Sequence, residues 1–283
     1  MYKRQAVDWA EHYNMSDVAG KLDVFKRYIE SKQAPRERSV VSRAVSVYRA
    51  VRARGHENGD RDAMLAFMAV LNAAWTHQEN NTSLTKYWPE ADEAGDAAQS
   101  LLGSVGIDMV MEQLLLPDLT NRKPPSIPLM IRHASGRIFQ EAHYLALAPI
   151  QTELFFDGQV KVAGPASKAL GAFFTPTPLV RTLAEQSMSR VDLQSNRIYV
   201  FDPACGSGEF LREAVRQLVL RGYKGQVTVT GYDISAPACL MARFGLAAEA
   251  ATFSGSLTIN IEHRDALDGE EWVTNVDVCL MNP

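Results

Sequence analysis

A glycine-containing turn between a strand-like and a helix-like segment constrains the fold more than any other feature of the sequence. The turn is Asp202-Pro-Ala-Cys-Gly-Ser-Gly208, which follows an apolar run at 198–203 and leads into a helical pattern at 208–221. Glycines at 206 and 208 let the backbone approach a ligand closely, and a helix start offers unpaired N–H groups and a positive dipole. We therefore expect a ligand with a carboxylate here, although many doubly wound proteins carry such a turn.

Strand-like and helix-like segments alternate on both sides of this turn. A strand is predicted at 227–234, a helix at 237–250, and two further strands at 257–263 and 276–281. Such alternation is typical of a parallel sheet with helices on both faces. The second part of the chain, 165–283, is therefore predicted to be an α/β domain that holds four parallel strands.

The first part of the chain has a helical pattern. Apolar residues recur at helix spacing within 40–51, a denser apolar run covers 64–75, and a third apolar segment runs from 97 to 116 before prolines interrupt it. A helix is also expected at 137–148, and Asp157-Gly158 predicts a hairpin. A chain of 283 residues favours two domains. We expect a mainly helical domain at 1–164, with the boundary near Gly164-Pro165.

The charge of the chain is uneven. Its net charge is −4, yet nine basic and only two acidic residues lie between Lys26 and Arg54. This basic stretch could follow the phosphates of a nucleic acid. It could equally be a solvated helix face near acids such as Asp60 and Asp62. Both interpretations remain open.

Composition excludes several classes of protein. No apolar run approaches the ~18 residues of a membrane span, and the charged amino terminus lacks the apolar stretch of a secretory signal. We therefore expect a cytoplasmic protein without a membrane segment. Cys205, Cys239 and Cys279 lack the spacing of a zinc site or a disulfide framework. They are predicted to be reduced thiols, with Cys205 packed in the core and no metal bound.

Two acids follow the next two predicted strands. Asp233, in Gly-Tyr-Asp-Ile, ends the second strand, where an acid can accept hydrogen bonds from ribose hydroxyls. The alternative is that Asp233 caps the next helix, a role that Ser235 could equally fill. Asp265, in His-Arg-Asp-Ala, ends the third strand and could accept an amino proton from adenine. Aspartates are common in loops, so Asp265 alone is a weak indication.

The complete series of motifs resembles the gamma-class adenine-specific DNA methyltransferases. The series is Gly171-Ala-Phe-Phe-Thr-Pro176, the glycine turn, Asp233, Asp265 and Asn282-Pro283. This family includes the modification subunits of type I restriction systems and fused type IIG enzymes. The resemblance implies a Rossmann-like methyltransferase fold preceded by a helical domain, and S-adenosylmethionine as the cofactor.

The resemblance also implies where this cofactor binds. Its methionine moiety would lie against Phe174, Thr175 and Pro176, and its amino acid end against Asp202, Pro203, Gly206 and Gly208. Its ribose would contact Asp233, and its adenine would contact Ile234, Asp265 and Ala266. The family often has tyrosine at the position of Phe174 and a small residue at the position of Glu209.

Asn282 and Pro283 are the catalytic residues that the resemblance implies. They follow the fourth predicted strand, so Asn282 stands at the same sheet edge as the glycine turn. The lone pair of an exocyclic amine is delocalised into its ring. Carbonyl acceptors from Asn282 and a proline can draw the amine hydrogens out of plane, so orientation and hydrogen bonding carry the rate. A base in duplex DNA must first be flipped out.

In this family another proline and an aromatic residue follow Asn-Pro, whereas the sequence here stops at Pro283. We therefore expect the chain to be part of a longer protein and incomplete for catalysis. The expected partners are double-stranded DNA and a target recognition domain, specificity subunit or restriction subunit. The basic stretch favours a DNA or subunit contact by the helical domain.

Other functions remain possible at this point. The leading hypothesis is methylation of the adenine amino group in DNA, for restriction-modification or phage defence. A cytosine amino-methyltransferase is the main alternative. RNA and protein-glutamine methyltransferases also use Asn-Pro-Pro-aromatic, but the Phe-Phe-Thr-Pro element argues against them. A subunit that binds cofactor or DNA without catalysis is the alternative from another class. The sequence predicts neither the recognition sequence nor the oligomeric state.

Overall fold

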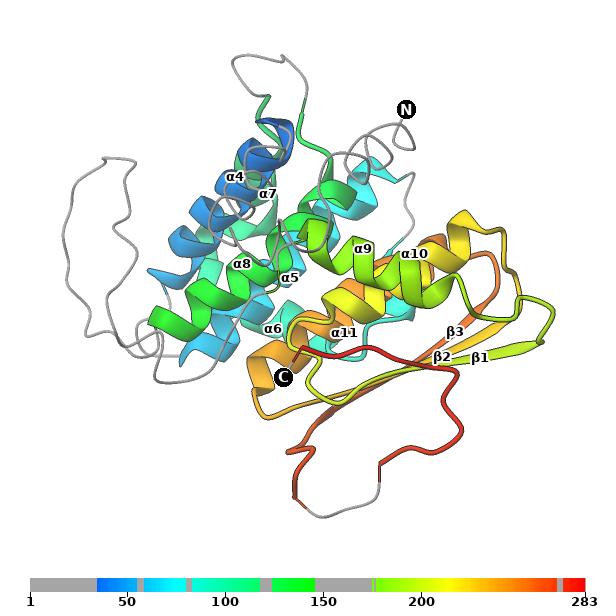
Figure 1. The fold of residues 1–283 in the computed structure, drawn as a ribbon. Coiled ribbons are helices and arrows are strands. Elements are labelled where there is room, and N and C mark those ends of the chain that lie inside the picture. Colours follow the sequence, from blue (N-terminus) through cyan, green and yellow to red (C-terminus); the bar gives the residue numbers. More distant parts are fainter. Residues whose placement is uncertain are drawn as a thin grey trace, which may run out of the picture. The chain divides into compact units, whose positions relative to one another are not determined.

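The computed structural model describes residues 35–54, 59–79, 83–117, 124–145, 175, 177–268 and 272–282 (Figure 1). The chain divides into two compact units, Met1–Ser39 and Val40–Pro283. The second unit contains the sheet and the described residues of the candidate site. The hairpin expected around Asp157-Gly158 and the domain boundary expected at 164–165 lie outside the described residues, so both stay predictions.

The helical expectation for the first part of the chain is confirmed where the structure describes it. The helices are α4 (Pro35–Arg52), α5 (Gly59–Gln78), α6 (Ala91–Leu102), α7 (Gly106–Leu115) and α8 (Ile127–Leu145), with short 3-10 turns η1 (Leu84–Lys86) and η2 (Gly103–Val105). The dense apolar run lies in α5, where Phe67 and Met68 are fully buried.

Two boundaries differ from the sequence expectation. The segment predicted as one helix at 97–116 is divided between α6 and α7, because Gly103 and Gly106 adopt positive φ angles of 48° and 69°. The helix expected from residue 137 instead begins at Ile127, and Pro128 occupies its first turn. Proline is compatible with a first turn because the N–H that it lacks would have no helical partner there.

The second part of the chain forms a four-stranded parallel sheet, as predicted. Its strands are β1 (Arg197–Asp202), β2 (Gln226–Asp233), β3 (Ser256–His263) and β4 (Val278–Cys279), in the order β3-β2-β1-β4. This is the order of the first strands in a Rossmann-like doubly wound sheet. The last strand is shorter than the predicted 276–281. The α/β class is confirmed.

Helices cover one face of this sheet. Figure 1 shows α9 (Thr177–Met188), α10 (Glu209–Leu220) and α11 (Ala236–Thr252) on one side of the strands, and the segment between β3 and β4 on the other. Right-handed crossovers from β1 to β2 and from β2 to β3 place α10 and α11 on the same side. The direction reverses only between β3 and β4, where the described residues form no helix. The expected helices on both faces are therefore not seen in the described part.

The helices before residue 145 and the α/β part share one hydrophobic core. Leu240, Met241 and Phe244 of α11 belong to the same buried cluster as the apolar residues of α5 and α8. The rings of Trp88 and Phe244 meet edge to face, with centroids 4.8 Å apart. The described helices therefore stabilise α11, which begins at the sheet edge discussed next. None of the described helices is long and apolar enough to cross a membrane.

Candidate active site

The glycine loop joins the end of β1 to the start of α10. Its Cys205 N–H donates to the Tyr232 carbonyl at 2.8 Å, which anchors the loop to the end of β2. Gly206 and Gly208 have φ angles of 53° and 78°, in the left-handed region that favours glycine. A Cβ on Gly208 would lie 3.1 Å from the Ala242 Cβ of α11, whereas one on Gly206 would meet nothing within 4 Å. The loop thus packs on α11 at one glycine and faces open space at the other.

The Asp233 carboxylate connects this loop to the next helix. Its Oδ2 accepts a hydrogen bond from the Gly206 N–H, and its Oδ1 accepts one from the Ser235 N–H, both at 2.8 Å. Ser235 itself is the N-cap of α11, since its Oγ accepts from the Ala238 N–H at 3.4 Å. The capping role considered for Asp233 therefore belongs to Ser235.

A second carboxyl group, that of Asp202, is buried beneath the loop. Only 1% of Asp202 is exposed, and its Oδ1 accepts from the Ala204 N–H at 3.0 Å. Burial raises the pKa of Asp202 to about 7; the Ala204 hydrogen bond opposes this shift, and the charge of Asp233 adds to it. Because the carboxyl groups of Asp202 and Asp233 both lie at this end of the loop, it favours a cationic ligand.

The ends of β2 and β3 are joined by hydrogen bonds. The Arg264 N–H donates to the Asp233 carbonyl, and the His263 Nε2 lies against the Ile234 carbonyl, each at 2.9 Å. Ile234 is 72% exposed, which leaves an apolar surface beside the loop. Asp265 follows in an exposed turn, where its Oδ1 accepts from the Leu267 N–H at 2.8 Å. The acids after β1, β2 and β3 therefore lie along one edge of the sheet.

The first and last predicted motifs meet at this edge. The Asn282 Nδ2 donates to the Thr175 Oγ1 at 2.8 Å, although 107 positions separate them. This orientation leaves the Asn282 Oδ1 to accept hydrogen bonds from another group. Pro203 is buried at the start of the glycine loop, and Ala266 is half-buried in the turn after β3. Phe174, Pro176 and Pro283 lie outside the described residues.

Comparison with known families agrees with this arrangement. Residues 160–283 match the family model described as N-6 DNA Methylase. No curated protein gives a significant match to the chain.

Solved structures of methyltransferases align with the chain at low identity. One, described as a class I S-adenosylmethionine-dependent methyltransferase from Listeria monocytogenes, is 15% identical with a TM-score of 0.43; the alignment covers 86% of this chain and 58% of that one. Another, described as a type I restriction-modification system methyltransferase subunit from Streptococcus thermophilus, is 15% identical with a TM-score of 0.39. That alignment covers 87% of this chain and 63% of that one. The chain thus spans less than two thirds of the length of either.

The sequence analysis did not predict a buried ionic cluster that supports the glycine loop. Arg212 on α10 is 1% exposed, and it donates to the Ser135 Oγ at 3.0 Å and the Ile131 carbonyl at 2.9 Å, both on α8. Its Nη1 also lies 3.4 Å from the carboxylate of Glu209, the residue directly after Gly208. The start of α10 is therefore linked through Arg212 to the helices before residue 145.

The cluster extends along α10 to α11. The Arg216 side chain pairs with Glu213 on its own helix and, at 3.0 Å, with Glu249 of α11. Four charged residues at positions 209, 212, 213 and 216 look in the sequence like an exposed helix face, because they have the spacing of ordinary surface ion pairs. The packing of α8 and α11 against this face makes it a buried one.

The described part of the basic stretch also has a structural role. The Arg43 Nη1 donates to the Leu116 carbonyl at 2.5 Å, just beyond the end of α7. A cation at this position satisfies carbonyls that have no partner within the helix. The residues before Pro35 lie outside the described ranges, so contact of the whole stretch with DNA stays a prediction.

The three cysteines, which all lie in the α/β part of the chain, are free thiols, as predicted. Cys205 and Cys239 are buried and Cys279 is exposed. Burial raises the pKa of Cys239 to about 11 and that of Cys205 well above its usual value, so both thiols remain protonated at neutral pH. Within the described ranges, no group of His, Cys, Asp and Glu side chains could hold a metal ion.

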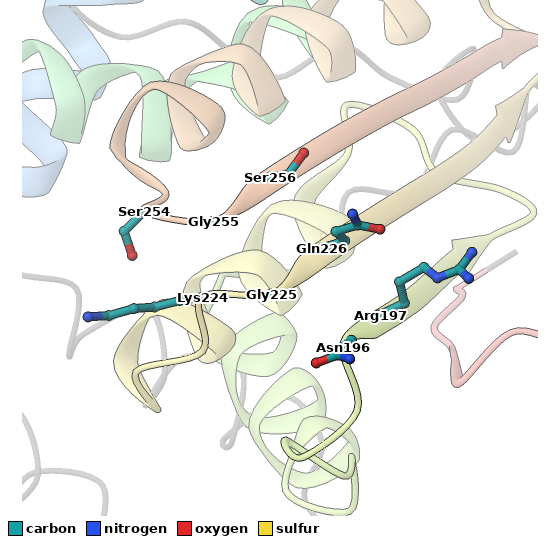
Figure 2. A pocket seen from close by; sticks show the side chains of 8 residues that line it. All are labelled: Asn196, Arg197, Lys224, Gly225, Gln226, Ser254, Gly255 and Ser256. Carbon is teal, nitrogen blue, oxygen red and sulfur yellow. The ribbon is translucent and has the colours of Figure 1, made fainter.

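A hollow of about 670 Å³ lies at the opposite edge of the sheet, where the strands begin (Figure 2). Its lining is polar, with Asn196, Arg197, Lys224, Gly225, Gln226, Ser254, Gly255 and Ser256. Ligands of open α/β sheets bind outside the carboxyl ends of the strands rather than at the amino ends. None of the predicted cofactor or catalytic residues lines this hollow, so it is not the candidate site.

Proposed function

We propose that the methylase domain binds S-adenosylmethionine at the carboxyl edge of its sheet and that the protein methylates the exocyclic amino group of adenine in DNA. The observation that carries this proposal is the Thr175–Asn282 hydrogen bond. It joins the two ends of the motif series at the edge where the glycine loop, Asp233 and Asp265 also lie. The family match at 160–283 supports the reaction class.

The amino acid end of the cofactor fits the glycine loop. Its carboxylate would meet the N–H groups at the start of α10, and its cationic groups would lie near Asp202 and Asp233. Burial raises the pKa of Asp202, and a cation beside this carboxyl group would favour its charged form. Gly206, which faces open space, leaves room for the ligand. Pro203, Phe174 and Pro176 complete the proposed contacts.

The nucleoside end would occupy the edge beyond Asp233. Each oxygen of the Asp233 carboxylate already accepts one backbone N–H, which fixes its orientation for ribose hydroxyls. The exposed Ile234 side chain offers an apolar surface to the adenine ring, and Asp265 with Ala266 would receive its polar edge. When bound, S-adenosylmethionine supplies an electrophilic methyl group on a sulfonium.

Asn282 is the proposed catalytic residue, together with the Pro283 carbonyl. The Thr175 hydroxyl holds the Asn282 amide with its Oδ1 available to accept a hydrogen bond from the target amine. Two carbonyl acceptors would orient the amine lone pair toward the methyl group, so the residues act by positioning rather than as a strong base. The target adenine would have to leave the duplex to reach them.

We further propose a cytoplasmic restriction-modification or phage-defence role. Double-stranded DNA would be the substrate, with a specificity subunit, a restriction subunit or a carboxyl-terminal target recognition domain as the partner. Cytosine amino-methylation and a non-catalytic cofactor-binding or DNA-binding subunit are the competing functions.

Mass spectrometry of nucleosides would test the reaction. Duplex DNA would be incubated with the full-length gene product and S-adenosylmethionine, digested and analysed. We expect N6-methyladenine, its loss in the Asn282→Ala variant, and its retention in Asn260→Ala, a matched change at an exposed position of β3. N4-methylcytosine instead would favour the cytosine alternative. Cofactor binding without transfer to any base would favour the non-catalytic subunit.

A further inference from the structure

A cluster of side chains on the second face of the sheet lies directly below the three acids of the proposed cofactor site. Phe201 precedes Asp202, Tyr232 precedes Asp233, and Arg264 precedes Asp265. Successive residues of a strand point to opposite faces. The residues just before the acids are therefore suited to set their positions from the far side of the sheet.

The members of this second-face cluster contact one another. The Phe201 and Tyr232 rings meet edge to face with centroids 5.1 Å apart, and the Arg264 guanidinium lies 4.5 Å from the centroid of the Tyr232 ring. Phe201 and Tyr232 are almost fully buried, at 1% and 2% exposure. Neither ring belongs to the hydrophobic cluster beneath α10 and α11.

Trp272 closes this cluster from the segment between β3 and β4, which lies on the second face (Figure 1). Its ring meets the Phe201 ring edge to face, with centroids 5.7 Å apart, and its indole N–H donates to the Ala266 carbonyl at 2.7 Å. It therefore contacts both the end of β1 and the turn that follows β3. Trp272 remains 41% exposed, so burial alone does not explain its position.

We propose that Trp272 is a positioning residue for the adenine of the bound cofactor. Its N–H holds the Ala266 peptide, and Ala266 follows Asp265, whose own Oδ1 accepts from the Leu267 N–H. These two hydrogen bonds fix the turn at 265–267, with the Asp265 carboxylate oriented for the adenine amino group. This inference rests on the proposed cofactor site and adds a residue that the motif series does not contain.

The test compares two ligands and two variants. Trp272→Phe keeps an aromatic ring against Phe201 but removes the indole donor. Trp88→Phe makes the same chemical change in the helical core, where Trp88 is 2% exposed. The ligands are S-adenosylhomocysteine and S-inosylhomocysteine, which lacks the amino group. Calorimetry gives the affinities, and thermal unfolding of each variant shows whether it is folded.

We expect Trp272→Phe to lower the affinity for S-adenosylhomocysteine about fivefold, as the loss of one hydrogen bond implies. Binding of S-inosylhomocysteine should change less than about twofold, because that ligand already lacks the group that Asp265 receives. Trp88→Phe should leave the preference between the ligands unchanged. Equal weakening of both ligands by Trp272→Phe, or no weakening, would overturn the inference. No binding of either ligand by the unaltered protein would instead refute the proposed cofactor site.

Discussion

The two glycines of the loop should respond differently to the same substitution. Alanine at either position adopts a left-handed conformation, which costs about 1 kcal/mol. At Gly206 the new methyl group meets nothing within 4 Å. At Gly208 it lies 3.1 Å from the Ala242 Cβ and 3.2 Å from the Ala242 Cα, and such overpacking adds about 1–3 kcal/mol. We therefore expect the free energy of unfolding to fall by about 1 kcal/mol in Gly206→Ala and by about 2–4 kcal/mol in Gly208→Ala.

Gly206→Ala should cost little stability but should strongly lower the affinity for the cofactor. The open space beside Gly206 is where we place the amino acid end of the cofactor, so a methyl group there removes room for the ligand. Gly206→Ala should lower the affinity for S-adenosylhomocysteine by at least about tenfold, or about 1.4 kcal/mol, while the protein stays folded. Urea unfolding followed by circular dichroism gives the stability, and isothermal titration calorimetry gives the affinity.

Two results would refute this reasoning. Equal free energies of unfolding for Gly206→Ala and Gly208→Ala would show that the contact with α11 does not constrain the loop. Unaltered affinity in Gly206→Ala would show that the cofactor does not approach this glycine. The two measurements are independent, so the packing argument and the binding argument can fail separately.

The remaining predictions concern charges. Arg212→Met should lower the free energy of unfolding by about 3–5 kcal/mol, because it leaves buried acids without their partner. Arg61→Met, at an exposed ion pair, should lower it by less than about 1 kcal/mol. Similar losses for the two variants in urea unfolding would contradict the buried cluster. Because burial raises the pKa of Asp202 from 3.8 to about 7, the unaltered protein should lose stability as pH rises between these values. Relative to the unaltered protein, Asp202→Asn should therefore gain on the order of 4 kcal/mol of unfolding free energy between pH 4 and pH 8. A difference that does not change with pH would refute the shift. Arg43→Ala should cost about 1 kcal/mol through its bond beyond α7, more than Arg54→Ala, and equal melting temperatures would contradict this.

The local chemistry of the sequence predicts much of the candidate site. The strand, glycine turn and helix around Gly206 and Gly208 follow from short-range pattern. The left-handed conformations of both glycines are a finding of the structure. The parallel sheet follows from strand and helix alternation. The motif order places Thr175 and Asn282 at the same edge of the sheet. Their hydrogen bond is seen only in the structure, because 107 positions separate the two residues.

Other features depend on partners that sequence pattern does not reveal. Arg212 has the spacing of a surface ion pair with Glu209, yet it is buried because α11 and α8, the latter some 80 positions earlier, both pack over it. Gly103 and Gly106 looked tolerable within one helix but end α6 and start α7. Trp272 belongs to no motif, and its contact with Phe201 arises because the chain crosses to the second face of the sheet before β4.

A structure of the protein bound to S-adenosylhomocysteine tests the central claim most directly. We expect the ligand at the carboxyl edge of the sheet, with its carboxylate at the glycine loop, its ribose on Asp233 and its adenine between Ile234 and Asp265. Density for the ligand at the opposite edge, in the hollow lined by Arg197 and Lys224, would contradict it.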